Sequence, residues 1–141
     1  MKAQRVQPIS DRAVLVYAGV LLILVVIAQT VTVMRGHAID VVSALALVPA
    51  AAWFALFTAH YRAAIAMRAY GWLGIHVIAY VLVVGSYWVH AGWLAGRGDS
   101  NLLEQGWSGP LIAMSAFWGM ALIAHTIRSI YTKGFDDVEP S

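Results

Sequence analysis

The chain has 141 residues, of which 61% are hydrophobic and 11% are charged, and its formal net charge is +2. Soluble domains contain about 45–50% apolar and about 25% charged residues, so this composition excludes an ordinary water-soluble domain. The absence of cysteine excludes disulfides, thiolate metal sites, iron–sulfur clusters and covalently attached c-type haem. The basic residues are spread over segment ends rather than gathered in one patch, so nucleic acid is not an expected partner.

Four long apolar segments, nearly free of charged residues, follow one another along the chain. About 20 apolar residues in a helix cross the hydrocarbon core of a bilayer, and a segment in lipid must pair its own backbone groups. The sequence therefore predicts an all-α integral membrane protein, a four-transmembrane-helix bundle made of two helical hairpins, with one domain over residues 1–141. The predicted spans are about 13–34, 41–61, 70–96 and 108–131.

Lysine and arginine are divided unevenly between the two ends of this bundle. Only Arg35 and Arg97 fall on the side away from the termini. Cytoplasmic segments carry the excess of cations, so the sequence predicts a multi-pass protein of the bacterial cytoplasmic (inner) membrane with both termini cytoplasmic. The acidic tail from Phe135 to Ser141 is expected to be disordered. The cations on the side of the termini are Lys2, Arg5, Arg12, Arg62, Arg68, Arg128 and Lys133.

Three residues predict where helices start or bend. Pro49 falls inside the second predicted span, where the missing N–H and the ring favour a kink. Ser108 stands where the N-cap of the last helix is expected, because serine accepts a hydrogen bond from the first turn. Pro110 then falls in the first turn, where its missing N–H costs nothing.

Rows of small residues mark the helix faces that are expected to pack closely. Helices in lipid associate through van der Waals contact, which small side chains permit. Ala51, Ala55 and Ala59 form such a row in the second span, and Ser115 and Gly119 form a shorter one in the fourth. The simplest interpretation is a seam within the bundle, and a homodimer interface is the alternative.

Histidines are the candidate ligands, because the spans contain no carboxylate or buried ion pair of the kind found in pumps and coupled transporters. His60 and His125 lie about 3–5 Å from neighbouring arginines by helical rise, and His76 lies about 12 Å from Arg68. These three, from three helices, could bind a metal or ligate haem b. Unequal depth counts against shared ligation, since His76 is expected about 7–9 Å deeper than the others. Interhelical hydrogen bonding is the alternative, and His37 in the first loop is expected to be solvated.

Residues 63–131 resemble the 2TM domain family, a bacterial two-helix membrane module found alone and attached to signalling proteins. The resemblance is carried by His76 with Tyr80 in the first helix, and by the pair Trp118-Gly119 with His125 in the second. It implies that His76 and His125 face each other across the helical hairpin. It implies no particular activity.

Three functions remain open at the level of sequence. The first is a non-enzymatic accessory or sensory subunit, which packs against other membrane subunits or against a second copy of itself within the lipid bilayer. The second is a b-type haem or metal-binding protein that uses His125 with His76 or His60. The third is a small-solute or proton channel along threonine and histidine positions. No residue is assigned a catalytic role.

Overall fold

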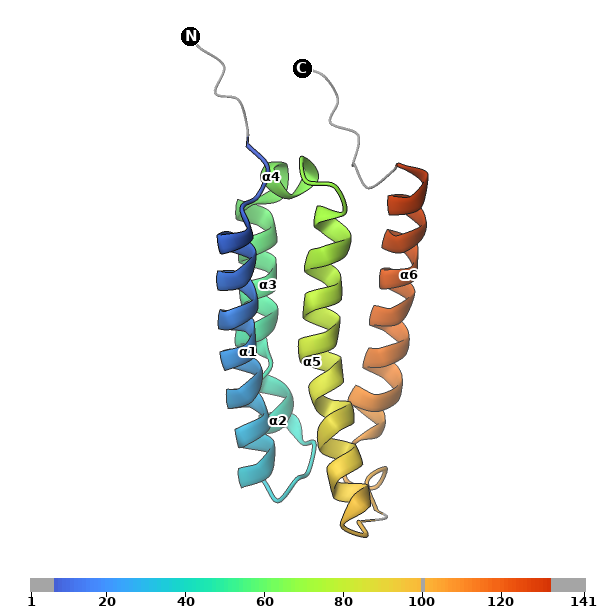
Figure 1. Cartoon of the computed structure of the whole chain (residues 1–141). Coiled ribbons are helices and arrows are strands. Elements are labelled where there is room, and N and C mark those ends of the chain that lie inside the picture. The colour runs from blue at the N-terminus through green and yellow to red at the C-terminus, as the bar shows by residue number, and fades with distance from the viewer. Residues whose placement is uncertain (1–6, 100, 133–141) are drawn as a thin grey trace.

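The structure is a computed structural model of the whole chain, and it describes residues 7–99 and 101–132. Long helices stand side by side, and the described residues contain no strand (Figure 1). Within these residues, four helical segments are long and apolar enough to cross a membrane, as the sequence predicts: Asp11–Met34, Val41–His60, Gly71–Gly96 and Gly109–Tyr131. The elements in chain order are α1 (Asp11–Met34), α2 (Val41–Leu45), α3 (Val48–His60), α4 (Arg62–Ala66), α5 (Gly71–Gly96), the π-helix η1 (Gly109–Met114) and α6 (Ser115–Tyr131).

The bundle has two distinct ends, which we name after the segments found there. At the terminal end, α1 begins, α4 links α3 to α5, and α6 finishes; the loop end contains residues 35–40, 97–99 and 101–108 (Figure 1). The terminal end carries Arg12, Arg62, Arg68 and Arg128, whereas the loop end carries Arg35 and Arg97. Lys2, Arg5, Lys133 and the tail Phe135–Ser141 lie outside the described residues.

Side-chain caps begin the first two helices. Ser10 precedes α1, and its hydroxyl accepts a hydrogen bond from the backbone N–H of Ala13 at 3.2 Å. Asp40 precedes α2, and its Oδ1 accepts from the N–H of Ser43 at 2.9 Å. Each cap satisfies a donor that the first helical turn would otherwise leave unpaired.

Pro49 interrupts the second span as expected. The helix stops at Leu45 and restarts at Val48, so Pro49 stands in the first turn of α3, where no N–H is needed. A continuous helix would press the proline ring against the carbonyl of Leu45.

The predicted N-cap at Ser108 is wrong. Ser108 has helical φ and ψ, and its side chain makes no capping bond. The last span opens instead with the π-helix η1, which contains Pro110 in its first turn. The hydroxyl of Ser115 donates to the carbonyl of Pro110 at 3.2 Å, so a side chain pairs with a backbone oxygen in this wide turn.

The core lies between α1, α3 and α5, around Tyr17. Tyr17 is fully buried, and its hydroxyl donates to the carbonyl of Ile75 at 3.4 Å. The indole N–H of Trp53 donates to the carbonyl of Tyr17 at 3.2 Å, and the Tyr17 and Phe57 rings lie 4.6 Å apart. Tyr17 therefore connects all three helices through one residue.

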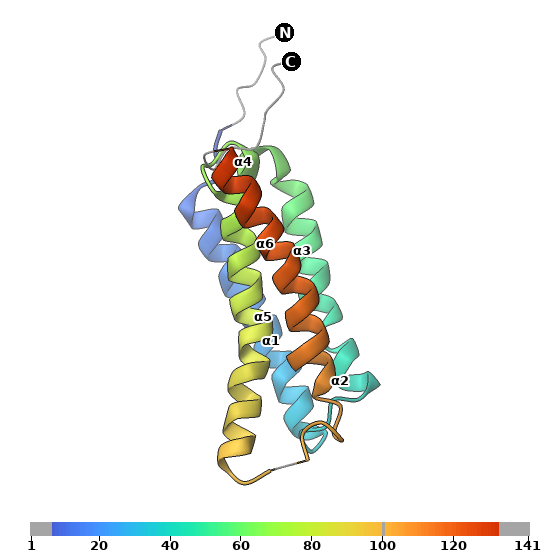
Figure 2. The same cartoon turned by 90° about the vertical axis from the view of Figure 1, so that its right-hand side faces the viewer.

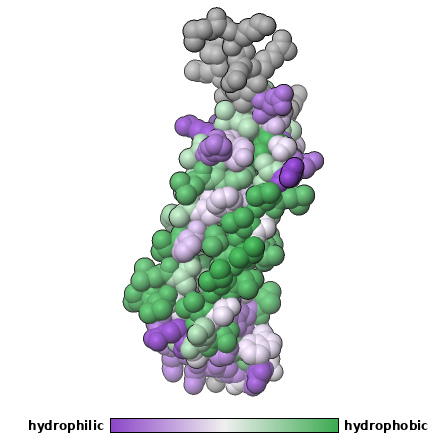
Figure 3. All heavy atoms as spheres, turned by 90° about the vertical axis from the view of Figure 1, so that its left-hand side faces the viewer, coloured by the Kyte–Doolittle hydropathy of each residue, from purple (hydrophilic) through white to green (hydrophobic). Residues whose placement is uncertain are grey.

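The last helix stands outside this core. α6 packs along α5, beside which it runs in Figure 2, and none of its residues is buried. Hydrophobic residues cover most of the middle of the bundle face in Figure 3, and hydrophilic residues gather toward its ends. A surface of this kind suits hydrocarbon better than water.

Candidate functional sites

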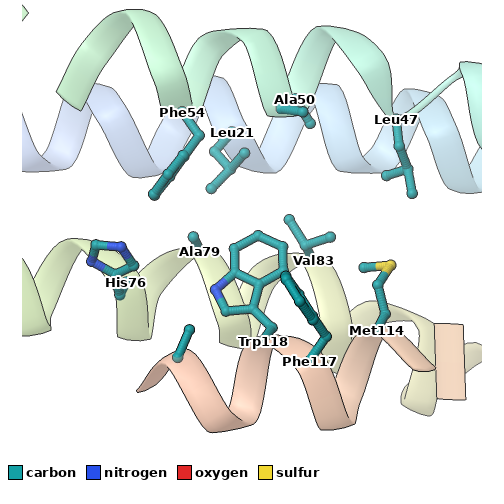
Figure 4. Close-up of a pocket in the computed structure, with 12 residues that line it drawn as sticks. Leu21, Leu47, Ala50, Phe54, His76, Ala79, Val83, Met114, Phe117 and Trp118 are labelled. Carbon is teal, nitrogen blue, oxygen red and sulfur yellow. The ribbon is translucent and has the colours of Figure 1, made fainter. Parts of the chain in front are cut away.

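An apolar cleft separates α3 from α6, and we call it the α3–α6 cleft. Its volume is about 390 Å³. Phe54 approaches it from α3, and its ring centroid lies 6.2 Å from that of Trp118 on α6 and 5.3 Å from that of His76 (Figure 4). His76 is the one histidine in its lining. The lining consists of Leu21, Leu47, Ala50, Ala51, Phe54, His76, Ala79, Val83, Met114, Phe117, Trp118 and Ala121.

His76 and His125 meet next to this cleft. Their rings stack with centroids 4.1 Å apart and an interplanar angle of 29°. His76 and His125 therefore face each other, and the expected difference in depth between these two residues is wrong. The expected depth of His76 starts the helix at Arg68, whereas α5 begins only at Gly71. His76 lies five residues after that start, and His125 lies six residues before the end of α6, so their depths match.

The proton position on His76 follows from its hydrogen bond. The Nδ1 atom lies 2.8 Å from the carbonyl oxygen of Trp72, and because a carbonyl only accepts, Nδ1 carries the proton. In the neutral ring Nε2 then holds a lone pair, as in most metal-ligating histidines. Lone pairs lie in the ring plane, however, so two stacked rings do not aim them at one shared atom.

His60 does not join this pair. It is exposed at the end of α3, where its ring contacts Tyr61 at 4.7 Å. Among residues 7–99 and 101–132, no group of three or more histidine or acidic side chains is arranged to hold a metal. The three histidines that the sequence groups together are thus divided in the structure into a stacked pair and a separate, exposed ring.

The two rows of small residues have different surroundings. Ala51, Ala55 and Ala59 are all exposed on α3, and Ala51 borders the cleft. Ser115 is half-buried and accepts a hydrogen bond at 3.0 Å from the indole N–H of Trp88. Gly119 is also half-buried, and an added Cβ there would meet no atom within 4 Å. The alanine row is therefore open to close contact from outside the chain.

The loop end contains a polar cluster that the sequence analysis missed. His37 is half-buried rather than solvated, and its Nδ1 lies 2.9 Å from Nε2 of His90 on α5. The cluster continues to Gln29 on α1, whose Oε1 lies 2.7 Å from Nδ1 of His90. Sequence reasoning missed it because His37 follows α1 in a turn with φ of +64°, and this turn directs the chain back onto α5.

An ion pair lies beside this cluster. Arg35 donates to Oδ2 of Asp40 through Nε at 2.8 Å and Nη2 at 2.6 Å. The N–H of Ser43 and the Arg35 guanidinium lower the pKa of the Asp40 carboxyl to about 2. Asp40 is therefore ionised throughout the range in which histidines titrate.

Comparison with protein-family models, with curated proteins and with solved structures finds no match for this chain. Functional conclusions therefore rest on the geometry of the cleft, the stacked histidine pair and the cluster at the loop end.

Proposed function

We propose that the chain is a non-enzymatic accessory or sensory subunit of a membrane, inserted through its four apolar helices, with both termini in the cytoplasm. Its partner is a membrane protein that places a transmembrane helix along the α3–α6 cleft. The uneven division of arginines between the two ends supports the orientation. The apolar surface between the ends supports insertion.

The observation that carries this proposal is the open side of the bundle. The rings of Phe54 and Trp118 approach each other across the cleft, yet α6 has no buried residue, and its extensive contacts in the described chain are with α5 and η1. A helix that packs on one neighbour leaves most of its perimeter for lipid or for another protein. This open side supports the proposal that a further helix packs beside α3 and α6.

The alanine row favours a helix over lipid as the occupant. Ala51, Ala55 and Ala59 recur at intervals of four residues on an exposed face of α3. Small residues at this spacing let two helix backbones approach closely, and the resulting van der Waals contact drives association within lipid. An acyl chain gains little from such a row, because it can fit larger side chains equally well.

Site-specific crosslinking in intact membranes tests this function. A photoreactive residue at Ala55 should give a discrete adduct of reproducible mass, and Ala55→Leu should weaken the complex in mild detergent by about tenfold, since one overpacked contact costs about 1–3 kcal/mol. Gly19→Leu is the matched control, because Gly19 is exposed on α1 and an added Cβ meets nothing within 4 Å. Equal crosslinking from photoreactive residues placed at Ala55 and at Gly19, or a chain that leaves its native membrane in mild detergent without a co-purifying membrane protein, would contradict the proposal.

One observation favours a second candidate, a b-type haem or metal site on His76. Nδ1 of His76 is engaged by the Trp72 carbonyl, which leaves the Nε2 lone pair for a ligand. His125 would serve as second ligand only after its ring turned out of the stack, and His60 lies apart. An optical spectrum and metal analysis of the purified chain test this candidate. A Soret band that His76→Ala abolishes would support this candidate. A purified chain that contains neither haem nor stoichiometric metal would rule it out.

A further inference from the structure

A chain of hydrogen-bonded side chains joins three segments at the loop end. The Ser86 hydroxyl donates to the carbonyl of Val83 at 2.7 Å. Nε2 of Gln29 donates to the Ser86 oxygen at 3.0 Å. Oε1 of Gln29 lies 2.7 Å from Nδ1 of His90, and Nε2 of His90 lies 2.9 Å from Nδ1 of His37. The segments joined are α1, α5 and the 35–40 loop.

Each proton in this hydrogen-bonded series of side chains has one permitted position. The Ser86 hydroxyl has a single proton, which Val83 accepts, so toward Gln29 it can only accept. Gln29 therefore turns its amide nitrogen to Ser86 and its oxygen to His90. Because that oxygen only accepts, Nδ1 of His90 carries a proton, and in the neutral ring Nε2 is the acceptor. His37 must then donate from Nδ1.

The backbone holds His37 in position for this contact. A φ of +64° is an uncommon, strained conformation for a residue with a side chain. The N–H of His37 donates to the carbonyl of Thr32 at 2.9 Å. The indole N–H of Trp107 donates to the His37 carbonyl at 2.8 Å, and the ring of Trp93 lies 5.7 Å from that of His37.

Proton counting shows what this arrangement can do. A first added proton can bind Nε2 of His37, and every hydrogen bond in the series from Ser86 to His37 is kept. A second added proton must bind Nε2 of His90, which would then face the Nδ1 proton of His37 across 2.9 Å. Nδ1 of His37 and Nε2 of His90 would then both be donors, and both rings would be positively charged. The hydrogen bond between them is therefore lost.

We propose that His37 and His90 form a proton-operated latch, which fastens the 35–40 loop to α5 while His90 is neutral and releases it once both rings are protonated. The closed state is therefore present at neutral and alkaline pH and is lost as the pH falls. Histidine is the side chain whose ordinary pKa, about 6.5, puts its charge change in this range. The latch requires no partner and stands independently of the proposed function.

The charged and titratable neighbours are consistent with this latch. Arg35 is paired with Asp40, and the guanidinium of Arg97 lies 4.8 Å from the Trp93 ring centroid. Because ionised Asp40 compensates the charge of Arg35, Arg97 is the nearby cation that opposes the addition of further positive charge. Among residues 7–99 and 101–132, the other titratable groups at the loop end are Tyr87 on α5 and Asp99 and Glu104 in the connection that follows it.

Solution NMR of the full chain in detergent micelles tests the latch. At pH 8 the imidazole ¹⁵N shifts should show His90 protonated on Nδ1 and unprotonated on Nε2. On acidification toward pH 5, protonation of His90 should coincide with movement of the backbone amide signal of Ile39, which lies in the 35–40 loop and donates to the carbonyl of Gln105 at 2.8 Å.

The matched variant is His37→Asn, because asparagine tolerates a positive φ but cannot take up a proton. In this variant the Ile39 amide signal should no longer follow the pH, whereas in His60→Asn, altered at the terminal end, it should behave as in the unmodified chain. A proton on Nε2 of His90 at pH 8, or an unchanged Ile39 titration in His37→Asn, would overturn the latch.

Discussion

His76 and His125 stack with their ring centroids 4.1 Å apart, although they lie on different helices. The contact fastens α6 to α5 near the terminal end. Nearer the loop end, the hydrogen bond from Trp88 to Ser115 provides a second attachment. Since no residue of α6 is buried, these two contacts help to set how α6 sits on α5.

Loss of the histidine stack should loosen α6. His125→Ala is expected to lower the free energy of unfolding by about 0.5–1.5 kcal/mol, the range for a stacked ring pair. Amide hydrogen exchange should accelerate in α6 but not in α1. His60→Ala is the control, because this exposed ring lies outside the pair, and equal effects of the two substitutions would show that the stack contributes nothing specific.

Gly71 should tolerate no side chain. It is buried where α5 begins, and an added Cβ would collide with the carbonyl oxygen of Ile65 in α4. Gly71→Ala is therefore expected to cost about 1–3 kcal/mol, as overpacking does. Gly74→Ala, one turn further along the same helix, has open space around the new Cβ and should be neutral or stabilise by about 0.5–1 kcal/mol. Denaturation in mixed micelles compares the two, and equal effects would contradict the expected collision.

The two tryptophans that donate hydrogen bonds near the loop end should differ sharply. Trp107 is fully buried and donates to the His37 carbonyl, so Trp107→Phe leaves that oxygen unpaired at an expected cost of about 1–3 kcal/mol. Trp88 is 53% exposed, and Trp88→Phe should cost about 0.6 kcal/mol, the average for interhelical hydrogen bonds in a membrane protein. Unfolding titrations of both variants test this order, and a larger loss at Trp88 would reverse it.

The length and apolar composition of four segments are sufficient to predict the long helices, because uninterrupted apolar segments have few alternatives in lipid. It also located the break at Pro49, where the covalent geometry of proline determines the outcome. The N-cap predicted at Ser108 is wrong, because the last span opens as a π-helix, which no short sequence motif specifies. The presence of a long helix can thus be predicted from composition, whereas the residue at which it begins depends on contacts in the folded chain.

The candidate sites were only partly predictable for a similar reason. The meeting of His76 and His125 depends on where α5 begins, and α5 begins only after Tyr70, whose φ of +58° lies outside the right-handed helical region. The contact between His37 and His90 joins a loop to a distant helix. No spacing rule relates two such positions, so the loop-end cluster could be seen only in the folded chain.

Acid should break the Asp40 cap of α2 at a lower pH than the pH at which it opens the contact between His37 and His90. The pKa of Asp40 is lowered from 3.8 to about 2, so its contribution to stability is present above the unfolded value and is lost as the pH falls through about 2. The amide signal of Ser43, which donates to Asp40, should therefore hold constant from pH 7 to pH 5 and move between about pH 4 and pH 2. In Asp40→Ala this acid transition should vanish, and its persistence would assign it to another group.

The orientation of the bundle can be read from cysteine accessibility, because the chain has no native cysteine. Leu103 is 65% exposed at the loop end, and Ala63 is exposed in α4 at the terminal end. If the arginine-rich terminal end is cytoplasmic, a membrane-impermeant maleimide added to intact spheroplasts should label Leu103→Cys and spare Ala63→Cys. Both variants should react after lysis, which controls for intrinsic reactivity. The opposite pattern would invert the topology, and labelling of both before lysis would argue that the helices do not span a sealed bilayer.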